Sequence, residues 1–143
     1  MNLGGIANLS HEQKVKRIAY DFCFANMGLN YLANQAGLAF DKDGEIAASG
    51  KVNGTLLGQI NSVYSKWQNT RPSLGRESFE SNFLSILNQE TFSGPDKMRT
   101  FCESIAIEIE KVLPRQKKKM KLLITGGGAL NTFLVELIKK RVA

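Results

Sequence analysis

The sequence predicts an α/β domain whose mixed sheet begins with an antiparallel hairpin and is covered by helices. Three observations support this fold class. Two short runs rich in apolar or β-branched residues, 2–9 and 14–20, open the chain and are separated by the polar turn 10–13. Between residues 26 and 113, apolar residues recur with the spacing of helices. An apolar run at 120–125 then leads through three glycines into a last helix, so the chain ends in strand–turn–helix order.

The helices follow from apolar residues spaced three and four positions apart, which places them on one face. Gly37 stops the first helix, Asn53 is a suitable N-cap for the second, and Pro114 ends the fourth, which has the most regular apolar stripe. The predicted helices cover 26–36, about 54–64, about 79–87, 96–113 and 129–141, with a turn at 41–44.

Composition predicts one soluble, cytoplasmic domain over residues 1–143. Hydrophobic residues make up 43% of the chain, enough to bury a core. Neither a long apolar run nor a basic segment leading into an apolar one occurs, so neither a membrane span nor a signal peptide is predicted. Cys23 and Cys102 are expected to be buried free thiols, and His11 is the one histidine, so no protein-held metal is predicted.

The formal net charge of +6 is concentrated in two basic clusters, 115–121 and 139–141. Such clusters can hold nucleic acid by neutralising phosphates. However, the first cluster falls in a predicted turn and the second at a helix C-terminus, where cations suit the helix dipole. No aromatic residues are interleaved to stack bases. We therefore expect solvated basic residues and no nucleic-acid partner.

Two glycine clusters carry the chemical signal. Gly4 and Gly5 interrupt the first predicted strand, which indicates either a bulge or the close approach of a ligand such as phosphate. Gly126, Gly127 and Gly128 lie between a strand and a helix, where bare backbone and a helix N-terminus can meet a nucleotide. A tight turn is the alternative. Three consecutive glycines exceed what it needs and favour a ligand.

Asp21 ends the second predicted strand, just before a helix. Enzymes of the α/β class place a general base at such an edge of the cleft. A carboxylate that only stabilises the N-terminus of a helix would stand at the same position. The residue pattern leaves both interpretations open and favours this structural role over a general base.

Six segments in order resemble one family, the anhydro-N-acetylmuramic acid kinases of the sugar kinase, heat-shock ATPase and actin superfamily. The first, Asn-Leu-Gly-Gly-Ile-Ala-Asn-Leu-Ser at 2–10, is similar to the family's NIGGIANLT. The others resemble an FDTGPGN or FDxCPxN pattern, an aromatic-Asp-x-x-Gly pattern, AASGKV, PKSTGRE and CGGGARN. They lie at 20–26, 40–44, 47–52, 71–77 and 125–131.

The resemblance implies a ribonuclease-H-like (actin-like ATPase) lobe, the C-terminal, nucleotide-binding lobe of a two-lobed kinase. Its implied ligands are ATP, Mg²⁺ bound through ATP, and an amino sugar. Asp21 matches the family's general base. Gly4, Gly5 and Asn8 would approach the phosphates, whereas Gly126, Gly127, Gly128 and Asn131 would lie beside the nucleoside.

The chain also departs from the family pattern. It lacks the GTSxDG and AGGQGAP segments of the first lobe, so the resemblance implies a fragment, a split gene product or a decayed remnant. The partners that it implies are the N-terminal lobe or a second copy of the chain. Bulky residues at 22–25 replace small ones, and Pro72 replaces a lysine. Three hypotheses remain: a kinase lobe that needs its partner lobe, a non-catalytic lobe acting in binding or assembly, and a nucleic-acid module. The sequence favours the first two.

Overall fold

The computed structural model describes residues 1–113 and 121–143, and these form a mixed α/β structure. Its sheet contains β1 (Asn2–Leu3), β2 (Ile6–Gln13) and β3 (Lys16–Phe24), in the order β1-β2-β3 with antiparallel neighbours. The helices are α1 (Asn26–Gln35), α2 (Glu45–Ser49), α3 (Gly54–Trp67), α4 (Arg76–Leu87), α5 (Gly94–Val112) and α6 (Thr132–Val142), with short 3₁₀ turns η1 (Lys42–Gly44) and η2 (Gly127–Leu130).

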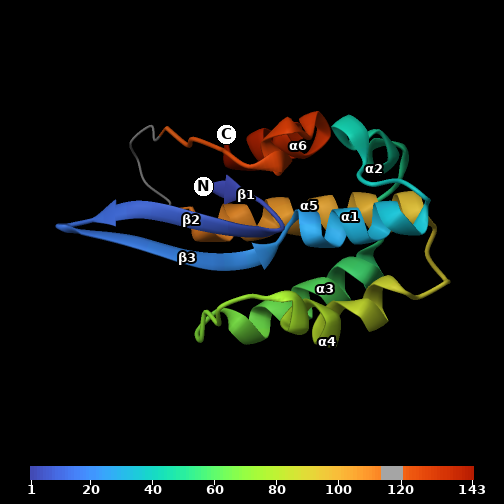
Figure 1. Cartoon of the computed structure of the whole chain (residues 1–143), viewed down its shortest axis with the longest axis horizontal. Helices are drawn as coiled ribbons and strands as arrows, with labels where there is room; N and C mark the ends of the chain where they lie inside the picture. Colours follow the sequence, from blue (N-terminus) through green and yellow to red (C-terminus); the bar gives the residue numbers. More distant parts are fainter. Residues whose placement is uncertain (114–120) are drawn as a thin grey trace.

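The hairpin is confirmed, but its boundaries differ from the prediction. The expected strand 2–9 is broken at Gly4 and Gly5, where the chain reverses so that β1 pairs with β2. The tight turn lies at Lys14 and Val15, not at 10–13. The polar residues 10–13 lie within β2 instead of forming the turn. Figure 1 shows the reason: the β2–β3 hairpin protrudes from the helical part of the molecule, so its strands are exposed. Exposed strands pair through their backbones without apolar side chains.

The predicted strand 120–125 is found only in part. Met120 lies outside the described residues, and the segment after it is not a regular strand. It runs beside β1 through a parallel bridge between Asn2 and Thr125. The Leu3 backbone N–H donates to the Thr125 carbonyl at 2.8 Å, and the Thr125 N–H donates to the Met1 carbonyl at 3.0 Å. This segment therefore lies along the edge of the sheet, as predicted, but it is not one of the strands of the sheet.

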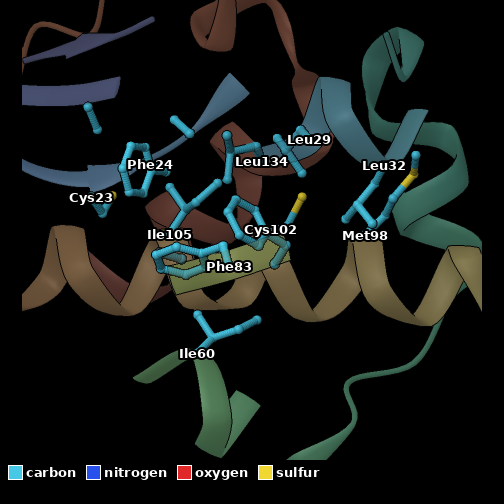
Figure 2. Close-up of a cluster of buried hydrophobic side chains, with 14 of the residues drawn as sticks. Cys23, Phe24, Leu29, Leu32, Ile60, Phe83, Met98, Cys102, Ile105 and Leu134 are labelled. Carbon is cyan, nitrogen blue, oxygen red and sulfur yellow. The ribbon is translucent and has the colours of Figure 1, made fainter. Parts of the chain in front are cut away.

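Helix α5 is the central element of the fold and contacts α1, α2, α3, α6 and β3. In Figure 1 it crosses the middle of the molecule, with α6 and α2 on one side and α3 and α4 on the other. Its regular apolar stripe explains this position, because Phe101, Ile105 and Ile109 are all fully buried. Figure 2 shows Ile105 between side chains from the strands and from several helices.

Of the residues at 22–25, Cys23, Phe24 and Ala25 are fully buried in this core, whereas Phe22 is partly buried. The Phe24 ring packs edge-on against Phe79, Phe83 and Trp67, with centroid distances of 5.2, 5.4 and 6.2 Å. Cys23 is also buried and, like Cys102, is a free thiol, as predicted. Burial raises the pKa of both thiols, so they stay protonated and inert.

The basic cluster at 139–141 lies at the C-terminus of α6 and pairs with carboxylates. Arg141 donates to Glu103 of α5 at 3.0 Å and to Glu110 at 2.9 Å, and Lys139 pairs with Glu136 at 2.7 Å. Most of the other cluster, 115–121, lies outside the described residues. Among the described helices, none is long and apolar enough to cross a membrane.

Candidate functional site

The two glycine clusters, far apart in the sequence, meet at the start of α1. The bridge between β1 and Thr125 brings them together. The Gly4 carbonyl accepts from the Asn26 N–H at 3.0 Å, and the Gly5 carbonyl accepts from Ala25 and Met27 at 2.9 and 3.1 Å. The first N–H groups of α1 are therefore already bonded, and bare backbone for a ligand must come from the glycines themselves.

The three consecutive glycines differ in what surrounds them. A Cβ atom on Gly126 would lie 2.2 Å from Asn2 Oδ1, and the residue has a φ of +85°. A Cβ on Gly128 would lie 2.7 Å from Leu3 Cβ. A Cβ on Gly127 would meet only the Asn26 side-chain amide, at 3.2 Å. Packing against β1 therefore explains Gly126 and Gly128, whereas the one tight contact at Gly127 is with the end of a side chain.

Gly4 and Gly5 form the bend between β1 and β2, so the bend interpretation of this cluster is correct. Yet neither residue has a positive φ. A Cβ on Gly4 would come no closer than 3.6 Å to another atom, and one on Gly5 no closer than 3.9 Å, both ordinary contacts. The bend alone therefore does not demand glycine at either position.

Gly127 lines a cavity of about 280 Å³ between the start of α1, the 40–43 segment and η2. Asn131 also lines this cavity, and its side chain stabilises α6 as well. Its Oδ1 accepts from the Leu134 N–H at 2.9 Å, which caps the N-terminus of α6. Sequence analysis assigned Asn131 to a nucleotide site and missed this cap.

Asp21 lines a different, larger cavity of about 610 Å³ between β3, the 67–74 loop and the end of α5. Its Oδ2 accepts from the Leu74 N–H at 3.3 Å, which orients the carboxylate. Asn8 lies directly across the sheet from Asp21, so the two side chains share one face. Of the predicted site residues, Gly127 and Asn131 line one cavity and Asp21 lines the other.

The Asp21 cavity contains aromatic and charged side chains that sequence analysis missed. The Arg71 guanidinium stacks over the Tyr20 ring at 4.2 Å, and Arg71 has a φ of +41°, a conformation rare for a bulky residue. Trp67 adds a further aromatic wall. Such a mixture of rings, amides and charges can hold a polar ligand that also has apolar faces.

Glu108 of α5 also lines the Asp21 cavity and is only 4% exposed. Burial raises the pKa of this carboxyl, and its ion pair with Lys111, at 2.7 Å, partly opposes the shift. The sequence contained a signal for Glu108, because it lies three residues after Ile105 on the apolar stripe of α5. A carboxylate on a buried helix face marks a cavity or a buried ion pair.

The described residues contain no group of three or more His, Cys, Asp or Glu side chains that could hold a metal ion.

A protein-family model described as "Anhydro-N-acetylmuramic acid kinase" matches residues 1–143. The curated protein of that name from Vibrio vulnificus (strain YJ016) is 30% identical over 148 residues, covering 100% of this chain and 40% of that protein. That of Xylella fastidiosa is 35% identical over 141 residues, covering 94% of the chain and 36% of the relative. The chain thus spans about 40% of the length of such relatives.

Proposed function

Because the chain belongs to the anhydro-N-acetylmuramic acid kinase family, we propose that it is the C-terminal, nucleotide-binding lobe of a two-lobed, ATP-dependent sugar kinase. In this proposal residues 1–143 form one domain of ribonuclease-H-like (actin-like ATPase) fold. A second lobe, on the same or a separate chain, completes the active site.

The observation that carries the proposal is the environment of Gly127. Its neighbours Gly126 and Gly128 are glycine because side chains there would collide with β1. A Cβ on Gly127 would instead meet only the end of the Asn26 side chain, at 3.2 Å, and Gly127 lines a cavity. A bare backbone position at the entry to a helix suits contact with a nucleotide. Gly4 and Gly5, also without a packing reason to be glycine, supply the approach to the phosphates, with Asn8 behind them.

The proposed reaction is the one that the resemblance to this family implies. Water adds to the anomeric carbon of 1,6-anhydro-N-acetylmuramic acid and breaks its bond to O6. The freed O6 takes the γ-phosphoryl group of ATP, which gives N-acetylmuramic acid 6-phosphate, ADP and a proton. Asp21 accepts the proton of the attacking water as general base. When bound through the ATP phosphates, Mg²⁺ would supply positive charge that offsets the charge developing on the transferred group.

Two features support Asp21 in that role. It lies in a cavity with aromatic and amide groups suited to a sugar, and the Leu74 N–H fixes its orientation. Asp21 and Gly127 line separate cavities. In this proposal the second lobe therefore has to bring the sugar and the γ-phosphate of ATP together. The same separation favours the second candidate function, a non-catalytic lobe that acts in binding or assembly.

Calorimetric titration with ATP and Mg²⁺ tests the nucleotide site. We expect ATP with Mg²⁺ to bind the chain weakly. We expect Gly127→Val to lower the affinity for ATP further, because the valine side chain enters the cavity. Gly58→Val is the matched control, because Gly58 lies on α3 with no atom within 4 Å of its added Cβ. Equal heats for the parent and Gly127→Val, or no heat at millimolar ATP, would argue against a nucleotide site here.

A further inference from the structure

The loop between α3 and α4, residues 68–75, contacts β3 at two consecutive residues. The Arg71 guanidinium lies over the Tyr20 ring at 4.2 Å, and the Leu74 N–H donates to Asp21 Oδ2 at 3.3 Å. Neighbouring side chains leave a strand on opposite faces, so Tyr20 and Asp21 point to different sides of β3. Because β3 is an edge strand of the described sheet, the loop reaches both sides past its open edge.

The orientation of the Asp21 carboxylate depends on this loop. The Leu74 N–H donates the one hydrogen bond that the described residues give to the carboxylate. At 3.3 Å this bond is longer than usual, so a small movement of the loop would break it. The Leu74 side chain is 8% exposed and anchors its end of the loop in the core. At the other end, the Arg71 N–H donates to the Trp67 carbonyl at 2.9 Å.

The backbone of Arg71 has an unfavourable conformation that the Tyr20 ring helps to hold. Its φ of +41° lies in the left-handed region, and the following Pro72 favours an extended residue before it instead. None of the ion pairs among the described residues involves Arg71, and its side chain is exposed. The stack on Tyr20 is therefore the contact that stabilises this conformation. Strained residues held in this way cluster at functional sites.

We propose that Arg71, through its stack on Tyr20, is a positioning residue for Asp21 and holds the loop where the Leu74 N–H meets the carboxylate. The inference rests on the proposed function, in which Asp21 is the general base, and adds the residue that keeps this base oriented. A general base acts only in the correct geometry, so its orientation affects the rate. Arg71 stands where the family's PKSTGRE pattern has proline, so the contact does not follow from the resemblance.

Hydrogen exchange of the Leu74 amide, followed by NMR on the full chain, tests the contact without a need for activity. We expect Arg71→Ala to raise the exchange rate about 2-fold to 5-fold, the change for loss of an exposed cation–π contact. Tyr20→Ala should raise it by the same factor, whereas Tyr20→Phe should leave it unchanged because the ring is kept. Lys66→Ala is the matched control, since Lys66 is an exposed cation of α3 that does not line the Asp21 cavity.

The kinetics of the assembled two-lobed enzyme test the consequence for Asp21. We expect Arg71→Ala to lower kcat by at least the same factor, with KM for the sugar nearly unchanged, because the base is less often oriented for attack. In an Asp21→Asn background, Arg71→Ala should lower kcat no further, since no base is left to position. A purely structural Arg71 would lower kcat by the same factor in both backgrounds.

The outcomes separate this inference from the proposed function. Equal Leu74 exchange rates in Arg71→Ala and Lys66→Ala would overturn the inference and leave the kinase lobe standing. A loss of kcat that persists in the Asp21→Asn background would also overturn it, as would a raised KM with unchanged kcat, which would mean that Arg71 binds the sugar. An assembled parent that does not turn over would overturn the proposed function and this inference with it.

Discussion

Individual glycines in this chain have different causes, although the sequence presents them alike. From the sequence, Gly126, Gly127 and Gly128 form one motif. In the structure Gly126 and Gly128 are needed by packing against β1, and Gly127 is not. No sequence pattern could separate them, because the atoms that crowd Gly126 and Gly128 belong to residues 2–3, more than a hundred positions away.

Substitutions at these glycines should therefore divide into two groups. We expect Gly128→Ala to lower the free energy of unfolding by about 1–3 kcal/mol, the range for overpacking, because its Cβ would lie 2.7 Å from Leu3 Cβ. Gly4→Ala should stay within about 0.5 kcal/mol of the parent, as unconstrained surface changes do. Urea unfolding of both variants measures the difference. A Gly4→Ala variant as unstable as Gly128→Ala would mean that the bend at Gly4 is tighter than described.

Among the secondary-structure elements, those with a regular apolar period were predicted well. Helix α5 was expected over 96–113 and spans Gly94–Val112, since its stripe packs against most of the fold. The hairpin turn was misplaced because the exposed arm needs no apolar residues. The candidate site depends on loops such as 36–44, whose path is set by side-chain bonds from Asn34 and Asp41 that periodicity does not reveal.

Helix α6 provides a test of the cap that sequence analysis missed. We expect Asn131→Ala to lower the free energy of unfolding by about 1 kcal/mol, because the Leu134 N–H loses its side-chain acceptor. Asn131→Asp should retain most of the stability, since a carboxylate oxygen can replace the amide oxygen. Thermal unfolding of both variants checks this. Equal losses in the two would show that the amide serves something other than the cap.

At the scale of the whole molecule, one buried carboxylate should make stability depend on pH. Burial raises the pKa of Glu108 above its ordinary 4.5 in the folded protein. As the pH rises from 4.5 through the raised pKa, the unfolded chain releases this proton before the folded chain does, so the folded state loses stability in that window. The pair with Lys111 reduces this loss without reversing it.

Glu108→Gln should remove this contribution. We expect its stabilising effect, relative to the parent, to be greater at about pH 7.5 than at about pH 4, where both states of the parent are protonated. Urea unfolding at the two pH values measures it. A stability difference that does not change with pH would mean that folding leaves the pKa of Glu108 unshifted, and one that reverses sign would mean that folding lowers it.

The proposed function includes catalysis, which needs both lobes and can be measured once they are assembled. The most direct measurement is ADP formation from ATP and 1,6-anhydro-N-acetylmuramic acid, after the matching first lobe of a related enzyme has been supplied to this chain. We expect the assembled parent to turn over, and we expect Asp21→Asn to lower kcat by about a hundredfold to ten-thousandfold, the range for loss of a general base, with ATP affinity nearly unchanged. A correctly folded assembly that is inactive, or an Asp21→Asn variant as active as the parent, would contradict the account.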